Sequence, residues 1–242
     1  MKCLTKNRWA VRLTLLCVTA SLLFTQAQAL DRPYRYNPQN DVLRYYVPKN
    51  DEKIIALTFD DGPHPTYTER VLQVLADHDA KATFFEVGMN AEYYPAVTKE
   101  ILAQGHEIGN HTYSHPDLSK LSQSEIEKEI QKQSKVIEEI TGAPPLYFRP
   151  PCGSCRDKII QSAEQHSLTV ILWSIDTRDW AGNDAAHIAE DVINSARPGD
   201  IILFHDYPVH ASQQTVEALE RILPALTAEG FRFVTISELL SK

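Results

Sequence analysis

The sequence of 242 residues has no internal repeat, no low-complexity tract and no long linker. Basic residues are not in excess either, since 24 lysines and arginines stand against 32 aspartates and glutamates, a formal net charge of −8. Nucleic acids and anionic membrane surfaces are bound by basic patches, so neither is expected as a partner. A chain of this length is expected to form a single domain with a sizeable core.

The first 29 residues have the pattern of a secretory signal peptide. Four lysines and arginines precede an apolar run at residues 13–24, which is too short to cross a membrane comfortably, and the small residues Ala27-Gln28-Ala29 follow. We predict cleavage after Ala29, export to the periplasm or the medium, and no stable membrane anchor afterwards; an uncleaved anchor is the alternative. Cleavage would change the net charge from −8 to −12, because residues 1–29 carry four basic and no acidic side chains.

Cysteine is scarce as well. Two of the four cysteines, Cys3 and Cys17, lie within the predicted signal peptide, so only Cys152 and Cys155 would remain. Their C-x-x-C spacing in an exported chain favours a local disulfide, with reduced thiols as the second interpretation. A thioredoxin-like redox motif would need a different βαβ surrounding, and a structural zinc site would need a second pair of ligands.

Residues 30–52 are rich in tyrosine and proline and are predicted to form an N-terminal arm, followed by one domain at 53–242. In that domain, helical patterns such as 69–78, 122–140 and 185–196 alternate with strand patterns at 54–59, 82–87, 106–109, 146–149, 168–174, 201–204 and 231–235. This alternation predicts an α/β fold with a parallel sheet. Candidate site residues follow the strand ends, which converge in a barrel but spread along a line in an open sheet. We therefore predict a distorted, incomplete (β/α)7 TIM-like barrel.

Two clusters of polar residues suggest chemistry. Asp60 and Asp61 follow an apolar run, and neighbouring side chains on a strand point to opposite faces, so one carboxylate can bind a cation while the other handles a proton. The pair also suits an ordinary turn. His111 and His115 are four residues apart, a spacing that one helical turn brings to one face. Two histidines and one carboxylate form the ligand set of catalytic zinc hydrolases.

Five segments, in order, resemble the motifs of the polysaccharide deacetylase family, which is carbohydrate esterase family 4 and includes the chitooligosaccharide deacetylases. These segments are Thr58–Pro63, His111–His115, Arg149–Gly153, Asp176–Trp180 and Leu203–His205. The resemblance extends from about residue 54 to the C-terminus, and five ordered motifs are far more specific than any one of them. It implies the incomplete barrel and a metal-dependent hydrolase.

The resemblance implies roles for the first two motifs. Asp61, His111 and His115 would hold a divalent metal, which we expect to be Zn²⁺, although Co²⁺ or Ni²⁺ could also occupy such a site. Asp60 would be the general base. Only the family motif decides which of the two aspartates is the base and which is the metal ligand.

In the later motifs, the resemblance implies the residues that donate a proton during the reaction. His205 would be the general acid, and Asp179 would hydrogen-bond to it and favour its protonated form. Lys81 and Arg149 are the two candidates to balance the charge of Asp179.

Four residues are expected to line the substrate side. Trp180 and Leu203 match the family's slot for the acetyl methyl group. Cys152 stands where the family usually has an aromatic residue; its backbone N–H would serve the oxyanion, and a backbone donor does not depend on the side chain. Arg149 lies in the same motif as Cys152 and is also expected on the substrate side.

The resemblance implies a polysaccharide N-deacetylase, a hydrolase of the amide bond in a polysaccharide that contains N-acetylglucosamine. Peptidoglycan is the default substrate, since the chain is predicted to be exported and carries no appended binding module. The alternatives are a chitooligosaccharide deacetylase, an O-acetyl esterase acting on a xylan-like polymer, and a catalytically silent carbohydrate-binding protein on the same fold. The sequence makes no prediction of oligomeric state.

Overall fold

The computed structural model describes residues 42–43, 52–208 and 212–241. These residues belong to one of the two units into which the chain divides, residues 36–242. The predicted signal peptide at 1–29 and nearly all of the predicted arm at 30–52 lie outside the described residues, so both remain predictions.

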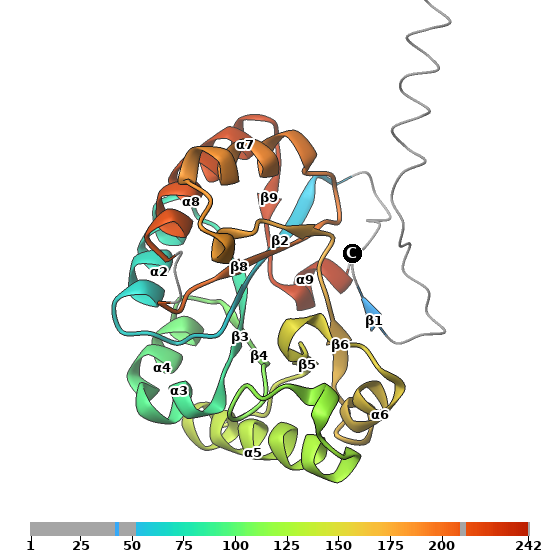
Figure 1. Ribbon diagram of the computed structural model, residues 1–242. Helices are drawn as coiled ribbons and strands as arrows, with labels where there is room; N and C mark the ends of the chain where they lie inside the picture. The colour runs from blue at the N-terminus through green and yellow to red at the C-terminus, as the bar shows by residue number, and fades with distance from the viewer. Residues whose placement is uncertain (1–41, 44–51, 209–211, 242) are drawn as a thin grey trace, which may run out of the picture. The chain divides into compact units, whose positions relative to one another are not determined.

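One parallel sheet forms the centre of the described unit (Figure 1). Its order is β1-β6-β5-β4-β3-β2-β8-β7, and β9 pairs with β2. The strands are β1 (Val42–Leu43), β2 (Ile54–Asp60), β3 (Ala82–Glu86), β4 (Glu107–Asn110), β5 (Tyr147–Phe148), β6 (Thr169–Ile171), β7 (Ile175–Asp176), β8 (Ile201–His205) and β9 (Arg232–Phe233). The described ends of this order, β1 and β7, do not pair with each other, so the barrel is incomplete, as predicted.

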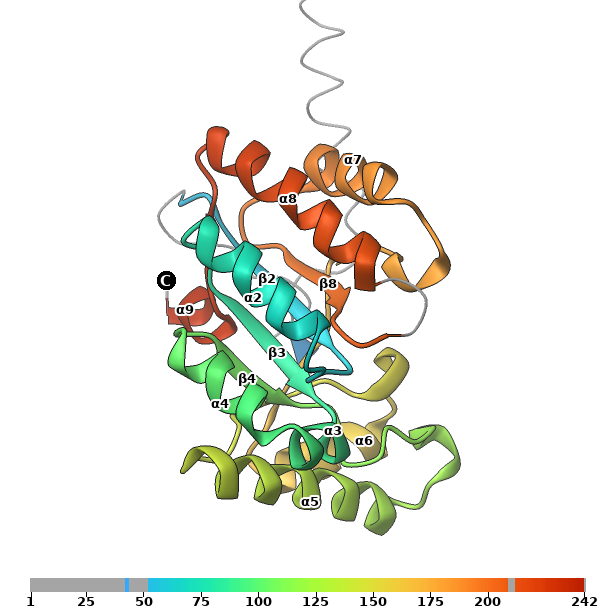
Figure 2. The same cartoon turned by 90° about the vertical axis from the view of Figure 1, so that its left-hand side faces the viewer.

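Helices surround the strands, and in Figure 1 the helices from α2 to α8 follow one another around the outside of the sheet. Figure 2 shows α2 and α8 lying over β2, β3 and β8. The helices are α2 (Tyr67–Asp77), α3 (Gly88–Tyr93), α4 (Pro95–Ala103), α5 (Gln123–Thr141), α6 (Asp157–Gln165), α7 (Ala185–Ser195), α8 (Ser212–Ala228) and α9 (Ile236–Ser241). Within the described ranges, no helix is both long and apolar enough to cross a membrane.

The central strand β2 explains how the site is placed. All seven of its residues are buried, because β3 and β8 flank it and both of its faces are covered. Ile55, Leu57 and Phe59 belong to the core cluster that includes residues of α2, α7 and α8. Ile54 and Ala56 belong to a second cluster on the other face. Because side chains alternate along a strand, Thr58 and Asp60 share that second face, which is the inside of the barrel.

All seven predicted strand patterns and all three named helical patterns are confirmed, with boundaries shifted by a few residues. The sequence did not predict β7 or β1, which have only two residues each. β7 directly follows the predicted strand pattern at 168–174, and β1 lies within the tyrosine- and proline-rich residues 30–52, so neither has a separate strand pattern of its own.

Candidate metal and catalytic site

Asp60 ends the central strand and Asp61 follows it, and the two side chains differ sharply in surroundings. Asp60 is the last residue of β2, is 3% exposed, and points inside the barrel with Thr58. Asp61 follows the strand with a φ of 77°, in the left-handed region that few residues with a side chain adopt. This turn of the backbone directs the Asp61 carboxylate toward the loop after β4.

That loop carries both histidines, and here the expected helical turn is wrong. His111 and His115 lie in an irregular loop after β4 rather than on a helix, because Thr112 and His115 have φ values of 68° and 53° and cannot continue a right-handed turn. The loop still brings the two rings together, with centroids 5.1 Å apart. Nε2 of His111 and Nε2 of His115 lie 3.4 Å and 3.3 Å from Oδ1 of Asp61.

These three residues fit a divalent metal ion. One ligand atom from each of Asp61, His111 and His115 lies within 4.8 Å of the other two. Oδ1 of Asp61 is buried and has no hydrogen-bond partner among the described residues. A buried oxygen without a partner is rare, and here it is available to coordinate a metal ion. Nδ1 of His111 lies 2.7 Å from the carbonyl oxygen of Arg149, so Nδ1 carries the proton and Nε2 keeps its lone pair. Burial alone would raise the pKa of Asp61, but the neighbouring imidazoles lower it to about 2, so its carboxylate stays ionised.

Arg149 fills the inside of the barrel and is fully buried. Its Nη1 donates to Oδ1 of Asp60 at 2.7 Å and to the hydroxyl of Thr58 at 2.8 Å. The rest of the guanidinium donates to the carbonyls of residues 171 and 172 and lies 4.1 Å from the ring of Phe85. Its placement on the substrate side was therefore wrong, because no part of it is exposed.

Arg149 and Lys81 were the candidates to balance the charge of Asp179, and neither does so. Arg149 pairs with Asp60, and Nζ of Lys81 donates to the carbonyl oxygen of Gln104. The cationic partner of Asp179 is the imidazole of His205 itself. Nδ1 of His205 lies 2.7 Å from Oδ1 of Asp179, which is fully buried.

Asp179 makes three hydrogen bonds that hold His205 in place. Besides Nδ1 of His205, it accepts from the backbone N–H of His205 at 2.8 Å and from the hydroxyl of Thr215 at 2.7 Å. Burial opposes protonation of His205, but the hydrogen bond and charge of Asp179, with the charges of Asp60 and Asp61, outweigh it and raise the pKa of His205 to about 9. His205 is the register partner of Asp60 across β2 and β8, so the two side chains sit at the same edge of the sheet.

Comparison with known proteins identifies the chain. The polysaccharide deacetylase family model matches residues 48–171. The sequence is 46% identical over 193 residues to a peptidoglycan-N-acetylglucosamine deacetylase of Bacillus cereus, which covers 79% of this chain and 90% of that relative. This chain belongs to the polysaccharide deacetylase family.

Two further members of the polysaccharide deacetylase family are similar. A chitooligosaccharide deacetylase of Azorhizobium caulinodans is 37% identical over 192 residues, covering 75% of this chain and 91% of that relative. A solved peptidoglycan N-acetylglucosamine deacetylase, in complex with 4-naphthalen-1-yl-N-oxidanyl-benzamide, has a TM-score of 0.79 at 38% identity, and the match covers 83% of this chain and 93% of that structure. The chain is thus a metal-dependent hydrolase of the deacetylase kind, while the roles of individual residues remain predictions.

Two of the expected groove residues of this polysaccharide deacetylase, Leu203 and Trp180, lie on adjacent elements. Leu203 is the register partner of Asp176 across β8 and β7, and Trp180 follows in the turn after β7. Leu203 is 3% exposed and Trp180 is 50% exposed, with its indole Nε1 at 3.4 Å from Oδ1 of Asp176. Cys152 is exposed and has a φ of 55° in the turn Pro151–Gly153.

The expected disulfide is absent from the structure, where Cys152 and Cys155 are not bonded to each other. The two side chains also differ in their surroundings. Cys155 is half-buried and packs against the core cluster of α5, α6 and β6, whereas Cys152 is exposed. The redox state of Cys152 and Cys155 in the exported protein stays a prediction.

Sequence reasoning missed the residues that support the site. Trp173 packs where a Cβ on Gly153 would stand, 2.8 Å from the indole, and so forms a wall beside Cys152. Asp206 and Asn90 hold the backbone next to Asp61. Asp206 follows His205 directly, and an acidic residue next to a buried strand was the one available signal.

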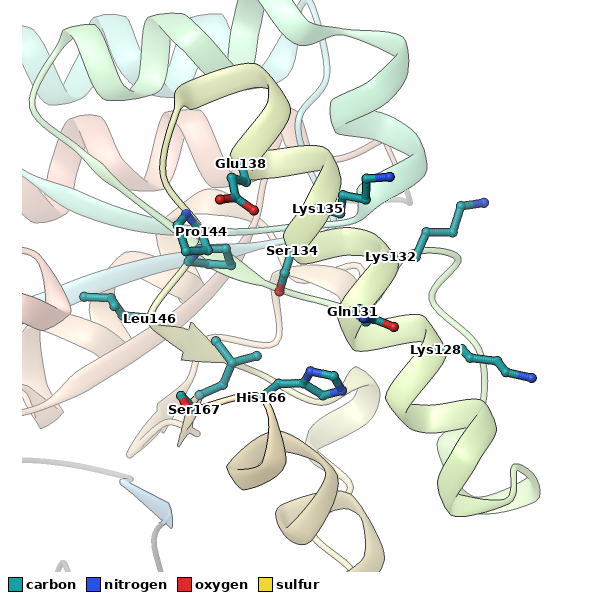
Figure 3. A pocket seen from close by; sticks show the side chains of 12 residues that line it. Lys128, Gln131, Lys132, Ser134, Lys135, Glu138, Pro144, Leu146, His166 and Ser167 are labelled. Carbon is teal, nitrogen blue, oxygen red and sulfur yellow. The ribbon is translucent and has the colours of Figure 1, made fainter.

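A separate groove of about 920 Å³ lies between α5 and the segments that precede β5 and β6 (Figure 3). In Figure 3, Lys128 and Lys132 extend away from Pro144 and Leu146, so their charges do not converge on the groove. None of the candidate catalytic or metal residues line it. The chemistry described above is therefore located elsewhere, at the carboxyl ends of the strands.

Proposed function

We propose that this protein is a zinc-dependent deacetylase that removes N-acetyl groups from N-acetylglucosamine units of a polysaccharide, with peptidoglycan as the substrate. The observation that carries the proposal is the convergence of Asp61, His111 and His115 beside Asp60 and His205. The similarity to a peptidoglycan-N-acetylglucosamine deacetylase supports the choice of polymer. One carboxylate with two imidazoles suits Zn²⁺, although Co²⁺ and Ni²⁺ also bind such sets.

Zn²⁺ held by Asp61, His111 and His115 would activate water and polarise the amide oxygen. Asp60 would accept the proton that the attacking water loses. Oδ1 of Asp60 is occupied by Arg149 at 2.7 Å, whereas Oδ2 lies 3.8 Å from Nε2 of His111 and so faces the ligand set. Oδ2 is therefore the basic oxygen, and Arg149 fixes its direction.

His205 supplies the proton that the departing amine needs. Its Nδ1 is bonded to Asp179, so the ring presents Nε2–H to the substrate. Burial lowers the pKa of His205, but the hydrogen bond and charge of Asp179 raise it, so the ring can hold the proton that it donates as the acid. The base and the acid thus sit on adjacent strands, β2 and β8, on either side of the place where the amide would bind.

The substrate side is proposed from the remaining motifs. Leu203 and Trp180 would contact the acetyl methyl, and the backbone N–H of Cys152 would donate to the developing oxyanion. A tetrahedral oxyanion needs such a donor at hydrogen-bond distance, and the exposed, left-handed turn at Cys152 presents backbone to solvent.

The test is acetate release by purified protein on four substrates: peptidoglycan, N-acetylglucosamine oligomers, peptidoglycan oligomers, and O-acetylated xylan. Zinc-dependent release from peptidoglycan at the highest kcat/KM supports the proposal. A higher kcat/KM on the N-acetylglucosamine oligomers than on peptidoglycan or its oligomers would favour a chitooligosaccharide deacetylase, like the relative from Azorhizobium caulinodans. Release from xylan alone would favour the O-acetyl esterase, and binding without release would favour the silent carbohydrate-binding protein.

Action on peptidoglycan requires that the protein reach the cell wall, and the signal-like residues 1–29 support export. Cleavage after Ala29 would leave Leu30 as the first residue of the exported protein. N-terminal sequencing of protein recovered from the periplasm or the medium tests this, and an intact Met1 on cell-associated protein would contradict it.

A further inference from the structure

The metal-ligand residue Asp61 has a backbone conformation that few residues other than glycine adopt. Its φ of 77° lies in the left-handed region, where a Cβ is crowded by the neighbouring carbonyl. Relaxation of this angle would turn the Asp61 carboxylate away from His111 and His115. Something outside the residue must therefore hold the backbone in place.

Two side chains hold opposite ends of one peptide group. The carbonyl oxygen of Asp61 and the N–H of Gly62 belong to the same peptide unit. Nδ2 of Asn90 donates to that carbonyl at 2.7 Å, and Oδ1 of Asp206 accepts from that N–H at 3.0 Å. Because the peptide unit is planar, fixing both ends fixes its orientation. The preceding peptide is held as well, since the N–H of Asp206 donates to the carbonyl oxygen of Asp60 at 3.2 Å, so φ and ψ of Asp61 are constrained together.

Both carboxylate oxygens of Asp206 accept hydrogen bonds from this loop and the residues next to it. It is 1% exposed, and its other oxygen, Oδ2, accepts from the hydroxyl of Thr68 at 2.5 Å. Oγ1 of Thr68 in turn accepts from the N–H of His64, two residues beyond Gly62, at 2.8 Å. The packing is built around glycine, because a Cβ at Gly62 would stand 2.4 Å from the Asp206 carboxylate.

Asn90 reaches the same peptide from another element. It lies in α3, whereas Asp206 follows β8, so the peptide is held between two parts of the fold that are 116 positions apart in the sequence. The N–H of Val87, just before α3, also donates to the carbonyl of Gly62 at 2.9 Å. The carbonyl of Asp61 and both backbone polar groups of Gly62 are thus paired.

We propose that Asp206 and Asn90 are positioning residues, which hold the Asp61–Gly62 peptide so that the Asp61 carboxylate points at His111 and His115. The inference rests on the proposed metal site. Residues that orient metal ligands typically contribute about 10- to 100-fold to metal affinity. The two side chains should therefore determine zinc affinity although both bond only to backbone near the ligand.

The test is the dissociation constant of Zn²⁺ for metal-stripped protein, measured by competition with a chromophoric chelator. Asp206→Ala and Asn90→Ala should each weaken zinc binding by about 10- to 100-fold. Asp206→Asn keeps an oxygen acceptor for the Gly62 N–H and should bind zinc within a few-fold of the wild type. This rescue separates positioning from loss of a negative charge near the ion.

Ser174→Ala is the control, because it also removes side-chain hydrogen bonds, which are part-buried and run to Asp200 and to the carbonyl of Ile201, but at the opposite end of β8. It should lower the melting temperature of the metal-free protein without changing zinc affinity. If Asp206→Ala does not fold, Asn90→Ala, on the half-exposed helix α3, decides the question.

Wild-type zinc affinity in a folded Asn90→Ala or Asp206→Ala protein would overturn the proposal. So would equal weakening by Asp206→Asn and Asp206→Ala, because charge and not positioning would then explain the effect. The measurement needs no substrate. Failure of the wild type to release acetate would refute the proposed function and leave this result intact, whereas failure of the wild type to bind zinc would refute both.

Discussion

Replacing Asp179 with asparagine removes the charge next to His205 while it keeps the size of the side chain. In the wild type, burial lowers the pKa of His205, but the hydrogen bond and charge of Asp179, with help from Asp60 and Asp61, raise it to about 9. In Asp179→Asn the largest favourable contribution is gone and burial remains. We expect the pKa of His205 to fall to the ordinary histidine value of about 6.5 or below.

The size of the effect follows from the protonated fraction. At about pH 7.5, a group with a pKa of about 9 is roughly 97% protonated, and one with a pKa of about 6.5 is roughly 9% protonated. Loss of the acid form alone therefore lowers kcat/KM about tenfold. Poorer orientation of the ring adds to this, since a positioned general acid contributes about 10²- to 10⁴-fold. We expect kcat/KM near neutral pH to fall by about 10- to 1,000-fold.

The assay is the pH dependence of kcat/KM for acetate release from N-acetylglucosamine oligomers, over about pH 6 to 10. The acid form of His205 is lost as the pH rises through its pKa, so lowering that pKa should move the alkaline fall in activity to lower pH in Asp179→Asn. The pKa of about 9 is that of the metal-free protein, and a bound divalent cation lowers it in the wild type and in the variant alike. The loss of the acid form in the variant is then at least about tenfold, and the difference between the two pH profiles is the prediction. Thr215→Val removes one hydrogen bond from Asp179 but keeps its charge, and should shift the profile less. An unchanged alkaline limb in Asp179→Asn would refute the role of His205 as the acid held by Asp179.

Three further predictions concern the metal site and its support. His115→Ala should lose zinc affinity and acetate release together, because it removes one of three ligands; metal content measured beside activity checks this, and full activity at wild-type zinc levels would contradict it. Arg149→Met should lower the free energy of unfolding by about 3 to 5 kcal/mol, because it leaves the buried carboxylate of Asp60 without its cation. Denaturant unfolding of metal-free protein measures this, and a change below about 1 kcal/mol would mean that the ion pair is not isolated from solvent. Gly62→Ala should destabilise by about 1 to 3 kcal/mol, since the new Cβ meets Asp206 at 2.4 Å; an unchanged melting temperature would show that the loop can move aside.

The strands were predictable because burial on both faces makes them apolar. β2 is buried along its whole length and β8 except at His205, so their sequences are continuous apolar runs that end at polar residues. The convergence of these polar residues followed from parallel strands that meet at one edge. The short strand β7 carries only Ile175 and Asp176, and its position depends on pairing with β8 rather than on any local pattern.

The spacing of the histidines predicted their proximity but not their conformation. His111 and His115 were expected on a helical turn, and they meet instead through a loop with two left-handed residues. The N–H groups of Tyr113 and Ser114 donate to one carboxylate oxygen of Glu129 in α5. A contact to a residue 15 or 16 positions away is not visible in a five-residue motif.

Charge partners were the least predictable part of the site. Arg149 pairs with Asp60 across 89 positions, because both side chains point inside the barrel, and the sequence does not show which strands are neighbours there. The same reason explains why Asp206 was missed. It follows His205 directly, yet its carboxylate bonds to the loop at Gly62, 144 positions earlier. Alternation along a strand predicts opposite faces but not what each face contacts.

The most direct test of the account is acetate release as Zn²⁺ is added back to metal-stripped wild-type protein, with Asp61→Asn as the control. The account predicts no release without metal, activity that rises with zinc and saturates near one ion per chain, and little or none in the control at the same zinc concentrations. Full activity in metal-stripped protein, or equal activity in Asp61→Asn, would contradict a reaction centred on Asp61, His111 and His115.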